Sequence, residues 1–123
     1  MLNKIIEIAG KKAYAGYCYA TEIVYKDLAK QDINDFLVEV QEAFNSDKLP
    51  DIKKTVYLIL SSMMSYYQSI GEDSPIKDND IMYGSTSAEL VIALAAVITL
   101  RKEFYHIPDG EPEEKKGNDG KNS

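Results

Sequence analysis

The chain has 123 residues, of which 45% are hydrophobic and 28% charged, and its formal net charge is −6. This length and composition predict one domain with a buried core. The acidic balance argues against nucleic acid and against an anionic membrane surface as partners, because both attract clusters of Lys and Arg.

The first predicted element covers Asn3–Tyr14, where Ile6 and Ile8 alternate with Glu7 before Gly10. Alternation followed by glycine predicts a short strand or extended arm that ends in a turn. A single strand has no evident partner in the sequence, so we expect it either to pair with a neighbouring subunit or to fray.

Residues 13–29 follow, and their apolar and aromatic side chains recur at steps of three and four. This spacing predicts a helix with one continuous stripe. The stripe consists of Tyr14, Cys18, Thr21, Tyr25 and Leu28. Gly16 costs up to about 1 kcal/mol relative to alanine in a helix, but the periodicity still favours a helix.

Two further helices have clear sequence boundaries. The first begins after Asp32, a favourable N-cap, and repeats its apolar residues at helical spacing until Asn45–Asp47. The second extends from about Pro50 to Ile70, because proline suits a first helical turn and Gly71 suits the position after a helix end.

An irregular segment rich in Asp and Asn comes next, with a short turn of helix expected around residues 77–82. Thr86 and Glu89 then form a capping box at the start of the last helix, which continues to about Tyr105. This helix is apolar on nearly every side, as expected at the centre of a core or at an interface. Residues 109–123 contain no apolar side chain, and we expect them to form a disordered charged tail.

These elements predict an all-α fold, a compact bundle of about four helices over residues 1–108. A short N-terminal strand or arm is the main alternative detail.

The expected compartment is the cytoplasm. The lone cysteine excludes an internal disulfide and fits a reducing environment. The N-terminal residues lack the long apolar stretch of a secretory signal. The most apolar run, residues 90–100, is shorter than the roughly 20 residues that cross a bilayer.

No group of residues has the composition of a catalytic or metal site. His106 is the only histidine, and Cys18 belongs to a different element. Asp73, Asp78 and Asp80 share a loop but lack the spacing, glycine and glutamate of an EF-hand. We therefore expect neither an enzyme nor a bound cofactor.

Nine tyrosines and no tryptophan are the unusual feature of the composition. Tyrosine suits both interfaces and the edges of a core, so both positions stay open. An acidic helical module with exposed aromatic rings is suited to binding another helix in a groove. The candidate contact residues are Tyr14, Tyr17, Tyr25, Tyr66, Tyr67 and Phe104.

Five stretches that cover nearly the whole chain resemble bacteriophage tail assembly chaperones encoded in prophages. They are IIEIAGKKAY, YATEIVYKDLAKQDINDF, LILSSMMSYYQS, DSPIKDNDIM and LVIALAAVITLRKEFYHIP. The resemblance implies a protein that binds the long helical tape-measure protein and keeps it soluble until tail-tube subunits displace it. The tail-tube protein is then a second implied partner. The alternative is a small, non-enzymatic helical adaptor or regulator of another partner, and a homo-oligomer is compatible with either function.

Overall fold

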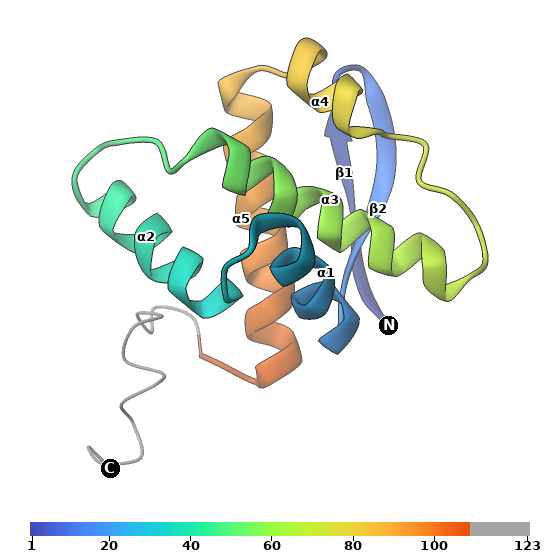
Figure 1. Cartoon of the computed structure of the whole chain (residues 1–123), viewed down its shortest axis with the longest axis horizontal. Coiled ribbons are helices and arrows are strands. Elements are labelled where there is room, and N and C mark those ends of the chain that lie inside the picture. Colours follow the sequence, from blue (N-terminus) through green and yellow to red (C-terminus); the bar gives the residue numbers. More distant parts are fainter. Residues whose placement is uncertain (109–123) are drawn as a thin grey trace.

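The structure is a computed structural model that describes residues 1–108. The predicted tail, residues 109–123, lies outside the described residues. The described chain is α+β: a two-stranded antiparallel hairpin followed by five helices (Figure 1). The prediction of an all-α bundle is therefore wrong, and the error lies mainly in residues 11–17.

The elements follow one another along the chain with short connections. They are β1 (Leu2–Ile8), β2 (Lys11–Tyr17), α1 (Tyr19–Ala29), α2 (Ile33–Asn45), α3 (Ile52–Ser69), α4 (Asp78–Gly84) and α5 (Ser87–Tyr105). The hairpin and α2 lie on opposite sides of α3 and α5, which cross in the middle of the molecule (Figure 1).

The hairpin forms because its turn and the alternation of its strands agree. Ala9 and Gly10 have positive φ angles of 56° and 78°, the pattern of a two-residue type I′ turn. The register continues from the pair Ile8–Lys11 beside the turn to Leu2 opposite Tyr17. One face of the hairpin is buried, and its buried side chains are Ile6, Ile8, Ala13, Ala15 and Tyr17.

The helix predicted over residues 13–29 begins only at Tyr19. Ala13, Ala15 and Tyr17 are buried, whereas Tyr14 between them is 40% exposed, which is the period of a strand. The partner strand that the sequence analysis did not find is the segment directly after the turn. Pairing satisfies the main-chain groups that the two segments turn toward each other, and it outweighs a helix that would have Gly16 in its first turn.

The other helices begin where local caps satisfy their first N–H groups. The side chain of Asp32 caps α2, as predicted. Asp51 caps α3 by accepting from the N–H of Lys54 at 2.9 Å. Thr86 and Glu89 form the predicted capping box of α5. The sequence therefore located α2, α3 and α5 to within a few residues.

Helix α5 runs along β1 and closes the buried face of the hairpin. Near the turn, Glu89 accepts a hydrogen bond from the N–H of Ala9 at 3.3 Å. At the far end, Lys4 and Glu103 form an ion pair at 3.8 Å. The core lies between the hairpin, α3 and α5 and reaches α1 and α2; its largest fully buried side chains include Ile8, Tyr17, Tyr25, Phe36, Leu58, Ile59, Met63, Leu94 and Leu100.

Candidate functional site

The six predicted contact residues do not share one surface. Tyr17, Tyr25 and Tyr67 are buried, Tyr66 and Phe104 are partly buried, and Tyr14 is exposed. The structure brings Tyr14, Tyr66 and Tyr67 together in one place and Tyr17 and Phe104 in another. Tyr25 lies apart from both groups and stacks on Phe36 in the core. A partner that touched Tyr17 or Tyr25 would have to open the core.

The first tyrosine group fastens the hairpin to α3. The rings of Tyr14 and Tyr66 stack with centroids 5.1 Å apart. The hydroxyl of Tyr67 accepts the backbone N–H of Tyr14 at 3.0 Å. The hydroxyl of Ser62 donates to the backbone carbonyl of Gly16 at 2.6 Å. Side chains of α3 thus take the place of a third strand along the outer edge of β2.

The second group is a polar network between β2, α1 and α5. The hydroxyls of Tyr17 and Tyr105 both donate to Glu22 Oε2, at 2.7 and 2.6 Å. Burial, reinforced by the Glu22 carboxylate, raises the pKa of both tyrosines above the ordinary value of 10.0. Arg101 stacks over the ring of Tyr105 and donates to Asn34 Oδ1 at 2.6 Å. These tyrosines are neutral hydrogen-bond donors at neutral pH and hold elements together, which gives them a structural role.

The geometry offers no centre for metal chemistry in residues 1–108. No three His, Cys, Asp or Glu side chains of this part gather closely enough to hold an ion. Asp80 instead accepts from the backbone N–H of Lys77 and from Lys11 Nζ, and these bonds lower its pKa. His106 caps the end of α5 in a left-handed conformation, with φ of 57°. None of the five helices in this part is long and apolar enough to cross a bilayer.

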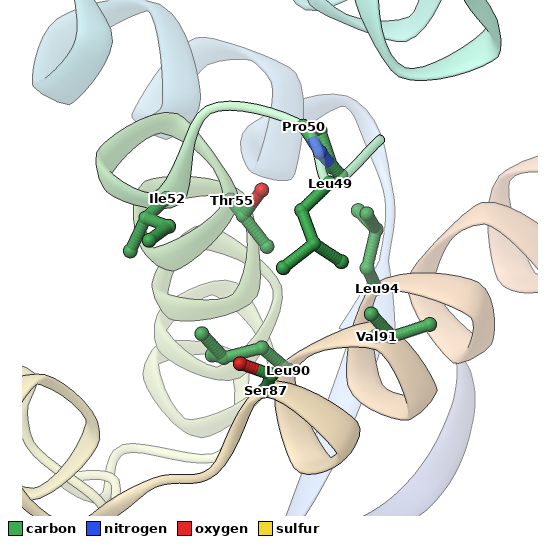
Figure 2. A pocket seen from close by; sticks show the side chains of 8 residues that line it. All are labelled: Leu49, Pro50, Ile52, Thr55, Ser87, Leu90, Val91 and Leu94. Atoms are coloured by element: carbon green, nitrogen blue, oxygen red, sulfur yellow. The ribbon is translucent and has the colours of Figure 1, made fainter. Parts of the chain in front are cut away.

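A small crease opens between the start of α3 and the start of α5 (Figure 2). Its volume of about 30 Å³ is far below the roughly 150 Å³ of a cavity that accepts benzene. Leu49 and Ile52 at its mouth are more than half exposed. The lining residues are Leu49, Pro50, Ile52, Thr55, Ser87, Leu90, Val91 and Leu94. The crease is an apolar surface feature and too small for a ligand.

A larger hollow lies on another side of α3, where the chain leaves this helix and returns toward α4. We call it the acidic-rimmed groove, and its volume is about 350 Å³. Its apolar and aromatic lining is Leu28, Tyr57, Leu60, Met64, Tyr67 and Ile76. Its polar lining is Gln68, Glu72, Asp73, Ser74, Lys77 and Asp78. Three carboxylates and one ammonium group give the rim a net negative charge.

Local sequence explains why this groove exists. Gly71, with φ of 71°, lets the chain reverse direction after α3. Ile76 is fully buried and anchors the returning segment. The hydroxyl of Ser74 accepts the N–H of Ile76 at 3.2 Å and donates to its carbonyl at 2.9 Å. The returning segment therefore stands as one wall of the groove, and α3 forms the floor.

Of the groove residues, only Tyr67 is among the contact residues predicted from the sequence. The floor residues Tyr57, Leu60, Met64 and Tyr67 recur at steps of three and four, so they were visible as one face of a helix. The sequence does not show the path of the loop after Gly71, because this path depends on the place in the core where Ile76 is buried.

Comparison of the chain with family models, with curated proteins and with solved structures finds no match. The residues and surfaces described above are therefore the basis for assigning a function.

Proposed function

We propose that this protein is a cytoplasmic phage tail assembly chaperone without enzymatic activity, which holds helices of the tape-measure protein in the acidic-rimmed groove. The observation that supports this function is the groove itself, with its apolar floor and acidic rim. An amphipathic helix binds such a groove by inserting apolar side chains from one face. The resemblance of the sequence to tail assembly chaperones selects the tape-measure protein as the source of that helix, and the tail-tube protein as the second partner.

The size of the groove fits anchoring by a few side chains. A cavity of about 150 Å³ accepts a benzene-sized group, so a groove of about 350 Å³ has room for more than one large apolar side chain. Met64 is unbranched and adapts to differently shaped side chains, which suits a chaperone that meets many segments of a long partner. The partly buried Tyr57 adds a ring with a polar end at the margin.

The rim predicts the charge of the bound segment. Glu72, Asp73 and Asp78 are exposed beside the groove, with only Lys77 opposing them. Complementary charge raises the rate of encounter and discriminates among partners. We therefore expect the bound helix to carry Lys or Arg next to its apolar face.

Co-expression with the tape-measure protein tests the proposal. The intact chaperone should raise the soluble yield of its partner several-fold. The floor variant Tyr57→Ala/Met64→Ala and the rim variant Glu72→Lys/Asp73→Lys should both lose most of this effect. The matched charge control is Asp35→Lys/Glu42→Lys, because both residues are exposed on α2 away from the groove.

The proposal fails if the intact protein leaves the tape-measure protein insoluble, or if floor and rim variants perform like the intact chain. The first result would favour the alternative of an adaptor or regulator with another partner. Circular dichroism of each variant shows whether the variant is still folded, so that a loss of chaperone effect can be assigned to the changed surface.

A further inference from the structure

The two outer edges of the hairpin differ. In an antiparallel pair, alternate residues turn their N–H and C=O groups away from the partner strand. On β2, the outward residues are Lys12, Tyr14 and Gly16, and α3 satisfies the Tyr14 N–H through Tyr67 and the Gly16 carbonyl through Ser62. Helix α3 therefore covers the edge of β2 from Tyr14 to Gly16.

The register shows which positions of β1 turn their main-chain groups outward. Tyr14 lies opposite Ile5 and Gly16 lies opposite Asn3, so Ile5, Asn3 and by alternation Glu7 turn their main-chain groups outward on the other edge. Within residues 1–108, the main-chain N–H and C=O groups of these three positions have no partner outside the hairpin. All three residues are exposed, and Ile5 is 61% accessible. This edge is open.

The open edge also lacks most of the features that prevent pairing. Such edges are commonly blocked by proline, a bulge, or an inward-pointing charge. Strand β1 is seven residues long, contains no proline and pairs in continuous register. Its one lysine, Lys4, is held by Glu103 of α5. A free edge of this length is a template for another strand.

We infer that β1 pairs with β1 of a second copy of this chain, antiparallel about a two-fold axis at Ile5, to give one continuous four-stranded sheet. This register places Ile5 opposite Ile5 of the second copy. It places the Asn3 amide opposite the Glu7 carboxylate, so that each pair joins a donor to an acceptor. Tyr14, next to Ile5 across the hairpin, extends the apolar centre on both sides.

Neighbouring registers are poorer, which argues for this symmetric arrangement. A two-fold axis at Lys4 would set two lysines directly opposite each other, which is destabilising. A two-fold axis at Ile6 would set Ile5 against the Glu7 carboxylate. Of these three registers, only the one centred on Ile5 places two isoleucines together in the middle and an amide opposite a carboxylate at each end.

The helix beside the edge leaves room for a second copy. Helix α5 follows β1 from Glu89 to Glu103. Between these residues its exposed positions are Ile92, Ala95 and Thr99, which are uncharged. Two copies of α5 can therefore approach without like-charge repulsion. The edge also lies away from the acidic-rimmed groove, because Ser62 and Tyr66 face the hairpin while Tyr57 and Met64 face the groove.

Sedimentation of the purified full chain over a range of concentrations tests the inference, with Ile5→Pro and Ile5→Lys as variants. Proline at position 5 removes an outward N–H that the hairpin does not use, and lysine places two charges at the axis. Each variant should raise the dimer dissociation constant at least tenfold. The control Ile52→Lys replaces an equally exposed isoleucine at the start of α3 and should leave the constant unchanged.

Hydrogen exchange gives a second readout on the intact chain. The amides of Asn3, Ile5 and Glu7 should become protected as the protein concentration rises, whereas exposed amides elsewhere should not. A chain that stays monomeric at millimolar concentration, or a dimer that both Ile5 variants leave intact, overturns the inference. A monomer whose edge amides become protected only on adding another protein would assign the edge to that partner instead.

Discussion

Glu22 accepts the hydroxyl groups of Tyr17 and Tyr105 on one carboxylate oxygen, and this small network joins β2, α1 and α5. The hydrogen bonds require tyrosine in its protonated form. Burial adds to this requirement, because it disfavours the charged phenolate. The folded state therefore binds two protons more tightly than the unfolded chain does.

The direction of the pKa shifts predicts how stability depends on alkaline pH. Unfolded tyrosine ionises near its ordinary pKa of 10.0, whereas the two folded pKa values are higher. The contribution of these tyrosines to the free energy of unfolding is complete at pH values below the unfolded pKa. It declines as the pH rises above that pKa, because the unfolded state then releases the protons while the folded state keeps them. The free energy of unfolding, measured with denaturant, should fall across this range.

The variant Tyr105→Phe serves as the comparison. It removes one of the two tyrosines that donate to Glu22, so the stability of the variant should decline less steeply with alkaline pH. An equal slope in both proteins would show that other groups control the alkaline transition.

The hairpin is held by side chains of a helix, and this is the main feature at the scale of elements. Ser62 donates to the buried carbonyl of Gly16, and no third strand is present in residues 1–108 to donate in its place. A buried carbonyl left without a donor costs about 1–3 kcal/mol.

Ser62→Ala should therefore lower the free energy of unfolding by about 1–3 kcal/mol. Ser69→Ala is the matched control, since this serine is exposed on the same helix and donates only to the carbonyl of Tyr66. Its effect should stay within about 0.5 kcal/mol. Chemical denaturation of both variants measures the difference, and equal effects would contradict the role given to Ser62.

Helix starts were predictable because their capping residues lie close together in the sequence. The second strand was not predictable, because it depends on contacts with residues far away in the sequence. Asp32, Thr86 and Glu89 mark helix starts through contacts within three residues, which a sequence displays directly. Residues 13–17 fit both a helical stripe and an alternating strand. The choice depends on Ser62 and Tyr67, some fifty positions away, and no local pattern reports such a contact.

The candidate site was also predictable only in part from the sequence. The floor of the acidic-rimmed groove is a helical face that can be seen in the sequence. Its acidic wall depends on where the chain travels after Gly71, which is set by tertiary packing. The sequence predicts Tyr17 and Tyr25 as contact residues because composition cannot separate a core tyrosine from an interface tyrosine, whereas in the structure both are buried.

Over the whole molecule, the strands and helices share one core. Ile8 of β1 is fully buried in the same cluster as Leu100 of α5. A domain with one core unfolds as one cooperative unit. The hairpin is therefore an integral part of the domain and cannot act as a separate arm.

Ile8→Ala and Leu100→Ala should each lower the free energy of unfolding by about 2–5 kcal/mol, as expected for buried large-to-small substitutions. Far- and near-ultraviolet circular dichroism should report a single transition in both variants. Ile92→Ala, at a position that is 70% exposed, should cost about 0.5 kcal/mol or less. A hairpin that melts separately in Ile8→Ala, with the helices intact, would refute a shared core.

The edge of β2 that α3 closes has a consequence for biosynthesis. The hairpin is translated before α3, so the groups that satisfy it, at Ser62 and Tyr67, are made later. At roughly 5–20 residues per second, the interval lasts on the order of several seconds. During that time the Tyr14 N–H and the Gly16 carbonyl have no partner from α3, so the hairpin reaches its final state only after α3 has been made.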